Sequence, residues 1–135
     1  MYAEVAGFYA RQMRHLDEGD AEGWAATFTE DAVCWLSTRA EPMRGRSGLV
    51  AGVRSATAAI AAVGEQRRHM TGMFEIEERP DGSLVVRANT VVYATGANGE
   101  SRVHQVCTCV DTLVRGTGPD NPLLVSNRRI DVDGT

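Results

Sequence analysis

Residues 84–115, LVVRANTVVYATGANGESRVHQVCTCVDTLVR, decide the fold class of this chain. Valine, threonine and other residues that favour the pleated surface of a sheet fill two runs, Leu84–Thr95 and Ser101–Arg115. Between the runs stands Gly96-Ala97-Asn98-Gly99, a tetrapeptide typical of a turn. The stretch therefore predicts two long strands joined by a turn.

Two further strands extend this pair in both directions along the chain. Upstream, Arg67–Glu77 predicts a long strand, and Pro80-Asp81-Gly82 is a strong turn signal before Leu84–Thr95. Downstream, the loop Gly116–Pro122 leads into a final strand, Leu123–Val132. Consecutive strands with such connections predict a four-strand antiparallel meander.

The first half of the chain has apolar residues at helical rather than alternating spacing. The elements expected there are a helix at Ala3–Leu16, a helix from Asp20 through Phe28, a strand at Asp31–Leu36 and a helix at Gly48–Val63 that Ser47 caps. Helices followed by a meander predict a segregated α+β fold. We expect a cone-shaped molecule, with three N-terminal helices packed on a strongly curved, mainly antiparallel β-sheet that encloses a cavity suited to a small molecule.

Length and composition narrow the function classes. The chain has 135 residues and predicts a single domain over 1–135, with 43% apolar and 24% charged residues. A formal net charge of −4 argues against a nucleic-acid-binding surface. All 14 basic residues are arginines, and the absence of lysine excludes Schiff-base catalysis, covalent pyridoxal phosphate and the P-loop. No apolar run is long enough to span a bilayer, so we expect no membrane partner.

The cysteines predict the compartment and argue against a metal site. Cys34, Cys107 and Cys109 accompany an N-terminus without a signal-peptide pattern, so we expect free thiols in a cytoplasmic protein. His104 precedes two of the cysteines, but no spacing forms a tetrahedral ligand set. Small buried core residues are the favoured interpretation, and we expect neither a metal nor a cofactor.

Five motifs stand in a fixed order along the chain. They are Leu16-Asp17-Glu18-Gly19-Asp20, Phe28-Thr29-Glu30-Asp31-Ala32-Val33, Met43-Arg44-Gly45-Arg46, Arg67-Arg68-His69-Met70-Thr71-Gly72 and Asn127-Arg128-Arg129-Ile130. Their order and spacing, over nearly the whole chain, resemble the SnoaL-like proteins of the nuclear-transport-factor-2-like superfamily. That superfamily includes dehydratases, polyketide cyclases, isomerases, epoxide hydrolases and non-catalytic binders, so the fold alone assigns no reaction.

Two positions look like catalytic residues of the scytalone dehydratases within this superfamily. Asp17 resembles their catalytic aspartate at the end of the first helix, and His69 resembles one of their histidines at the start of the long strand. The resemblance implies that the two lie within hydrogen-bond reach at the cavity, where a carboxylate fixes the histidine tautomer for proton transfer. The chain departs from the pattern at Leu16, where a tyrosine is expected, and near Tyr93 or Ala94, where a second histidine would fall.

The resemblance implies a cofactor-independent lyase or isomerase, of the dehydratase or polyketide cyclase type, acting on a hydroxy-carbonyl substrate. His69 would move the proton and Asp17 would orient it, although Asp17 equally suits a structural role in which it satisfies backbone amides at the helix junction. Asn89 and Tyr93 share one strand face and are expected to hold substrate oxygens, although Tyr93 also suits a packing role. Two other candidates for substrate binding are Trp35, which also suits the core, and His104, which could face either side of the sheet.

A second hypothesis belongs to a different class. It is a non-catalytic ligand-binding or accessory subunit, such as the small β subunit of a ring-hydroxylating dioxygenase, in which Asp17 and His69 would be unpaired or bridged to surface groups. Under either hypothesis the strands Ser101–Arg115 and Leu123–Val132 carry apolar residues on both faces. A chain of this size cannot cover both faces alone, so we expect a homodimer packed through the sheet.

Overall fold

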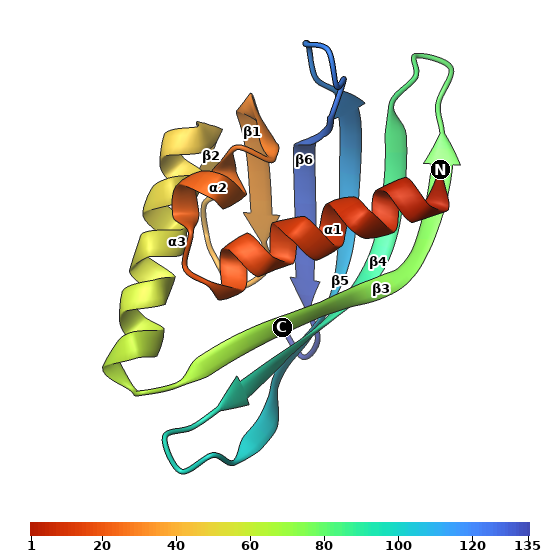
Figure 1. Cartoon of the computed structure of the whole chain (residues 1–135). Helices are drawn as coiled ribbons and strands as arrows, with labels where there is room; N and C mark the ends of the chain where they lie inside the picture. Colours follow the sequence, from red (N-terminus) through yellow and green to blue (C-terminus); the bar gives the residue numbers. More distant parts are fainter.

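The computed structural model describes all 135 residues, which form three helices and six strands (Figure 1). In chain order these are α1 (Tyr2–Asp17), α2 (Ala21–Ala25), β1 (Phe28–Leu36), β2 (Met43–Arg44), α3 (Gly45–Ala62), β3 (Gln66–Glu78), β4 (Leu84–Thr95), β5 (Ser101–Arg115) and β6 (Leu123–Val132). The predicted α+β class and the bounds of the last three strands are confirmed. None of the helices has both the length and the apolar character needed to cross a bilayer.

The strands form one sheet in the order β2-β1-β6-β5-β4-β3. The predicted antiparallel meander runs from β3 to β6. An unpredicted feature is the parallel pairing of β1 with β6, which places Cys34 opposite Arg128. Figure 1 shows α1 lying across one face of the sheet and α3 standing beside β1. The helices therefore cover a single face, as expected for the cone.

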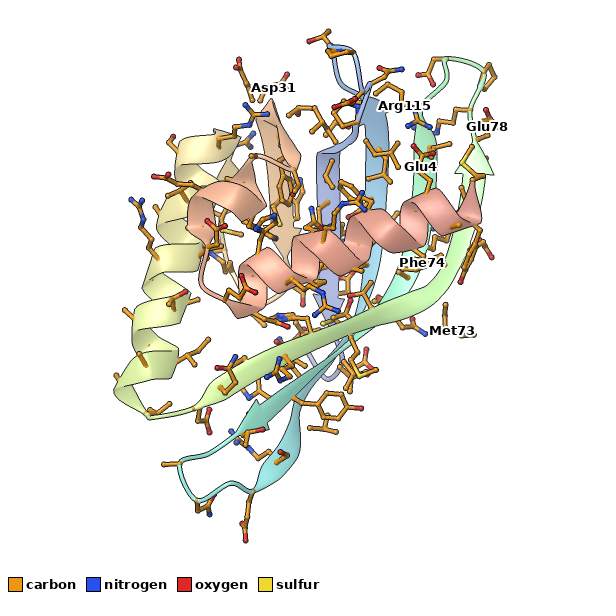
Figure 2. The ribbon with its side chains drawn as sticks, in the orientation of Figure 1. Glu4, Asp31, Met73, Phe74, Glu78 and Arg115 are labelled. Carbon is orange, nitrogen blue, oxygen red and sulfur yellow. The ribbon has the colours of Figure 1, made fainter.

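Bulges bend the sheet around α1. The pairing of β3 with β4 shifts between Gly72 and Glu75, and Met73 within the shift has a φ of 57°. A bulge inserts an extra residue and increases the local twist, so neighbouring side chains are redirected. Met73 points away from α1, whereas Phe74 lies beneath it and stacks on Tyr9 with ring centroids 4.9 Å apart (Figure 2). The bulge thus fixes α1 against the sheet.

The hydrophobic core fills the space between the helices and the sheet. Its largest side chains come from all layers and include Phe8, Tyr9, Trp24, Phe28, Leu49 and Leu113. Trp24 and Phe28 pack with ring centroids 4.6 Å apart, as their spacing predicts. An exposed ion pair between Glu4 and Arg115 ties the start of α1 to the end of β5 (Figure 2). All three cysteines are buried and free, which agrees with their predicted core role.

Two predicted helix boundaries are wrong. The second helix ends at Ala25 rather than Phe28, because the amide and hydroxyl of Thr27 both donate to the Trp24 carbonyl and close the last turn. Phe28 instead begins β1. The third helix begins at Gly45 directly after β2, so Ser47 lies inside it and does not cap it. Gly45 has a φ of 67°, a conformation that glycine adopts without strain, and this allows the abrupt change from strand to helix.

Candidate active site

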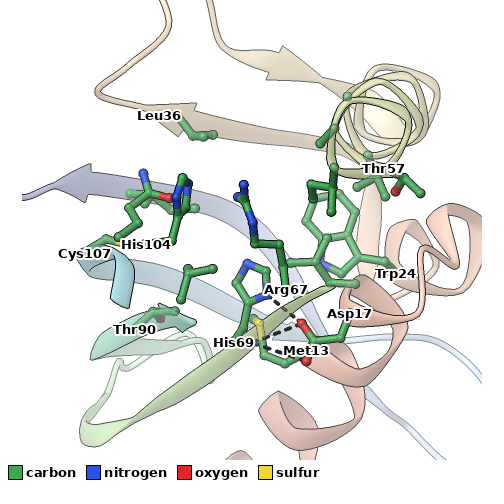
Figure 3. A pocket seen from close by; sticks show the side chains of 18 of the residues that line it. Met13, Asp17, Trp24, Leu36, Thr57, Arg67, His69, Thr90, His104 and Cys107 are labelled. Atoms are coloured by element: carbon green, nitrogen blue, oxygen red, sulfur yellow. Dashed lines mark hydrogen bonds and ion pairs between the residues drawn. The ribbon is translucent and has the colours of Figure 1, made fainter. Parts of the chain in front are cut away.

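A cavity of about 470 Å³ lies between the helices and the covered face of the sheet. More of its lining is apolar than polar, and its polar side chains include Asp17, Arg67, His69, His104 and Arg128. This size and this mixture of surfaces are typical of small-molecule sites. Figure 3 shows the imidazole of His69 between the end of α1 and the opposite wall of the cavity.

Asp17 and His69 are in direct contact. Nδ1 of His69 lies 2.7 Å from Oδ1 of Asp17, and the His69 backbone N–H donates to Oδ1 and Oδ2 at 3.1 and 3.3 Å. The side chains of Asp17 and His69 are only 14% and 21% exposed, respectively. The proximity that the resemblance implies is therefore present, and three contacts define the orientation of the carboxylate.

The local sequence explains how Asp17 reaches β3. Asp17 is the last residue of α1, and Gly19 turns the chain with a φ of 73°, which disfavours any other residue. A Cβ on Gly19 would also lie 3.0 Å from Cγ2 of Thr57, so this glycine lets α3 approach the turn. On the other side, the Gln66 side chain donates to the Asp17 carbonyl at 3.3 Å. The end of α1 is thus held between α3 and β3.

The contact determines which nitrogen of His69 is free. An ionised carboxylate only accepts hydrogen bonds, so Nδ1 carries the proton and donates to Asp17. In the neutral imidazole Nε2 then has the free lone pair. No hydrogen bond within the protein involves Nε2 of His69, and the side chain lines the cavity. The geometry suits a general base whose orientation is set by Asp17.

His104 enters the same cavity from β5, near a cluster of charges at the start of β3. Glu65 accepts from Arg67 at 2.7 Å and from Arg102 at 2.8 Å, and these hydrogen bonds lower the pKa of Glu65. Partial burial, followed by the two guanidinium groups, lowers the pKa of His104. His104 is therefore predominantly neutral at pH 7 and can donate or accept a hydrogen bond.

Three sequence-predicted binding residues lie elsewhere. The cavity lining includes Thr90 and Val92 of β4, and because side chains alternate along a strand, Asn89 and Tyr93 lie on the opposite face. Both are exposed there, as is Trp35 of β1, which is 40% exposed. The expectation that Asn89, Tyr93 and Trp35 would contact a substrate in this cavity is corrected. Of the four predicted binding residues, only His104 lines it.

The sequence predicts that one of Arg128 and Arg129 pairs with a carboxylate such as Asp131 or Asp111, but it does not place such a pair in the cavity wall. Arg128 of β6 is 2% exposed and lines the cavity, and its partner Asp111 of β5 is fully buried. The sequence does contain a signal that Asp111 is buried, because Asp111 falls in the same alternation as the inward residues Cys107, Cys109 and Leu113. A carboxylate in that phase must have a buried partner.

No group of three or more His, Cys, Asp or Glu side chains lies close enough together to bind a metal ion. The polar groups around the cavity instead combine one oriented imidazole, a second imidazole and several guanidinium groups. This combination can transfer protons and stabilise negative charge on oxygen.

The fold is that of the SnoaL-like proteins. The model of the SnoaL-like domain matches residues 1–134, and the chain belongs to that family. No curated protein matches the sequence.

Solved structures of three relatives share the fold over almost the whole chain. Aln2 from a Streptomyces species is 36% identical, with a TM-score of 0.88 over 98% of this chain and 90% of its own. ActVI-ORFA from Streptomyces coelicolor is 32% identical, with a TM-score of 0.90 over 99% of this chain and 96% of its own. A protein from Catenulispora acidiphila, solved in complex with S-DNPA, is 38% identical, with a TM-score of 0.83 over 98% and 92%.

Proposed function

We propose that this protein is a cofactor-independent dehydratase or cyclase that acts on a polyketide-like hydroxy-carbonyl compound inside the cavity. The observation that carries the proposal is the contact between Asp17 and His69, which leaves Nε2 of His69 free at an apolar cavity. A proton-transfer enzyme needs an oriented base at a site with limited access to water. The complex of the C. acidiphila relative with S-DNPA supports a small-molecule ligand for the family fold.

The proposed dehydration has two proton transfers. Nε2 of His69 takes a proton from the carbon next to the substrate carbonyl, and the C–H electron pair forms the enolate. The enolate then forms a C=C bond as the β-hydroxyl leaves, and His69 returns the proton so that the hydroxyl departs as water. Asp17 stabilises the imidazolium between these transfers through Nδ1. His104 is proposed to bind a substrate oxygen on the opposite wall.

The non-catalytic hypothesis predicts that Asp17 and His69 are unpaired or bridged to surface groups. The observed contacts favour the enzyme instead, because the carboxylate receives both the ring and the backbone N–H of His69. An imidazole held in a single tautomer presents a defined proton acceptor, which the removal of a proton from carbon requires. No observation in the molecule specifically favours an accessory-subunit role, so catalysis is the single function that we propose.

The test uses a β-hydroxy ketone whose dehydration is easy to detect. 3-Hydroxy-1-tetralone loses water to give 1-naphthol after tautomerisation, and 1-naphthol fluorescence reports the rate. The wild type is expected to accelerate this loss, and His69→Gln is expected to remove the acceleration. His15→Gln is the matched control, because His15 pairs with Asp20 away from the cavity. Equal rates for the wild type and His69→Gln would contradict the proposal.

A further inference from the structure

The hydrogen bonds of Arg128 leave one of its nitrogens without a partner. Nε donates to Oδ1 of Asp111 at 2.9 Å, and Nη2 donates to Oδ2 of Asp111 at 2.8 Å and to Oε1 of Gln12. A guanidinium group has five N–H donors, and these contacts use three of them. Both N–H groups of Nη1 have no acceptor within the protein.

Nη1 is nevertheless accessible. The one side-chain nitrogen or oxygen that is fully enclosed without a partner is Nε1 of Trp24, so Nη1 of Arg128 is not enclosed. The Arg128 side chain keeps 3% of its surface exposed, and the residue lines the cavity. The exposed part of this guanidinium group therefore opens into the cavity.

Its surroundings hold Arg128 rigidly. Asp111 is fully buried and accepts from Tyr9 at 2.6 Å and from Cys109 at 3.2 Å, in addition to the two Arg128 contacts. Four donors occupy the lone-pair positions of this carboxylate, so Asp111 has no capacity left for a ligand. The guanidinium also lies over the Phe28 ring, 5.1 Å from its centroid. Arg128 is thus a fixed donor that cannot turn away to find another partner.

We propose that Nη1 of Arg128 donates a hydrogen bond to the carbonyl oxygen of the substrate and stabilises the negative charge that this oxygen gains when His69 removes the neighbouring proton. This proposal rests on the proposed function and adds the group that stabilises the enolate. A fixed donor aimed at developing charge is effective because the protein need not reorganise during the reaction. Arg128 is then a catalytic residue.

The same geometry narrows the substrate class. Asp111 already neutralises the formal charge of Arg128, so this wall offers a directional donor rather than a net positive charge. Such a site suits a neutral ketone or a conjugated enol oxygen better than a carboxylate. The substrate class is thus a neutral ketone whose carbonyl faces β6 while the carbon next to it faces His69 of β3.

The first experiment needs no substitution that could unfold the protein. Arginine side-chain nitrogen NMR of the wild type is recorded with saturating 1-tetralone, which has the carbonyl but no leaving hydroxyl, and with tetralin, which lacks the oxygen. We expect the Nη1 signal of Arg128 to move with 1-tetralone and to stay in place with tetralin. If the Nη1 signal does not move with 1-tetralone while 3-hydroxy-1-tetralone is still dehydrated, this proposal is overturned and the proposed function stands.

The second experiment measures affinity by quenching of Trp24, which also lines the cavity. Arg128→Lys keeps a cation but loses the two-nitrogen hold on Asp111, and it is expected to weaken 1-tetralone binding about 10- to 100-fold while leaving tetralin unchanged. Arg129→Lys is the matched control, because Arg129 is exposed and pairs with Asp131. An Nη1 signal that moves without any dehydration of 3-hydroxy-1-tetralone would support the donor but contradict the proposed function. Failure of both ketones to bind would overturn both proposals.

Discussion

His69 donates to Asp17 from two different parts of the same residue, the ring Nδ1 at 2.7 Å and the backbone N–H at 3.1 Å. The backbone contact keeps the carboxylate in place whatever the imidazole does. The ring contact can therefore be lost without a movement of α1. This division of roles separates the effects of substitutions at the two positions.

Substitution of His69 is expected to affect turnover and to leave the fold intact. His69→Gln keeps the backbone N–H that holds Asp17, but removes the nitrogen that accepts the proton. We expect the rate of 1-naphthol formation to fall by about 10²–10⁴-fold, the usual contribution of a positioned base. Initial rates and urea unfolding of the same samples check both parts. If His69→Gln lost both the rate and a large part of the free energy of unfolding, the prediction that His69 affects turnover but not the fold would be wrong.

The effect of a substitution at Asp17 is expected to depend on whether the new side chain keeps an oxygen acceptor for the His69 backbone N–H. Asp17→Asn retains an oxygen acceptor for the His69 backbone and should slow turnover less than His69→Gln does. Asp17→Ala leaves this partly buried N–H without a partner, and we expect a loss of about 1–3 kcal/mol in the free energy of unfolding. Urea titration of the three proteins measures the order. Equal stability of Asp17→Ala and Asp17→Asn would show that the backbone contact is dispensable.

The buried ion pair is expected to matter far more for stability than its exposed neighbour on the same strand. Asp111→Ala leaves Arg128 charged and unpaired inside the core, at a cost of about 3–5 kcal/mol. The double variant Asp111→Leu/Arg128→Met should recover most of that loss, because it removes both charges. Asp131→Ala removes the partner of exposed Arg129 and should cost within about 0.5 kcal/mol. Chemical unfolding of the wild type and these three variants provides the comparison.

The pKa of His104 predicts a pH-dependent loss of stability. Burial and the charges of Arg67 and Arg102 lower this pKa from its ordinary value of 6.5, against a smaller opposing effect of Glu65. The unfolded chain therefore binds more protons than the folded chain just below pH 6.5, so stability falls as the pH drops through that window. His104→Gln should lose less stability than the wild type between pH 7 and pH 5. Parallel unfolding curves for the two proteins over this range would refute the assignment.

The protein is expected to form a homodimer in which two chains pack together through the outer face of the sheet. Strand register places Met70, Val91 and Val106 in one row and Tyr93 beside Val103 in another. Four of these five side chains are exposed, and together they form an apolar patch opposite the cavity. Light scattering should give twice the 14.6 kDa mass of the chain. Met70→Glu/Val106→Glu should give the monomer mass, whereas a monomeric wild type at micromolar concentration would count against the patch as an interface.

The fold could be predicted because its signals are local. Turn residues separate long β-rich runs, and the bounds of β4, β5 and β6 agree with the sequence to the residue. The pairing of β1 with β6 could not be predicted in this way, because no local pattern specifies which distant strand lies alongside. The helix boundary at Phe28 failed for a related reason: an aromatic residue at helical spacing suits a strand equally well.

The candidate site was predicted only in part. Asp17 and His69 came from a resemblance that concerned two specific positions. Asn89 and Tyr93 were placed on the wrong face of β4, because both faces of that strand carry apolar and polar residues and the alternation does not reveal which is inward. Arg128 and Arg129 are adjacent and chemically identical, so only the observed register shows that Arg128 is the buried one.

The parallel pairing of β1 with β6 also links the order of synthesis to the order of folding. Gln12 of α1 accepts a hydrogen bond from Arg128 of β6, which lies 116 residues further along the chain. Tyr9 of α1 donates to Asp111 of β5, which lies 102 residues further along. A nascent chain that lacks β6 therefore has an open β1 edge, and both Asp111 and the Oε1 atom of Gln12 lack their partner Arg128. The strand that closes the sheet beside β1 is also the strand that carries Arg128, so a nascent chain without β6 has an incomplete cavity wall.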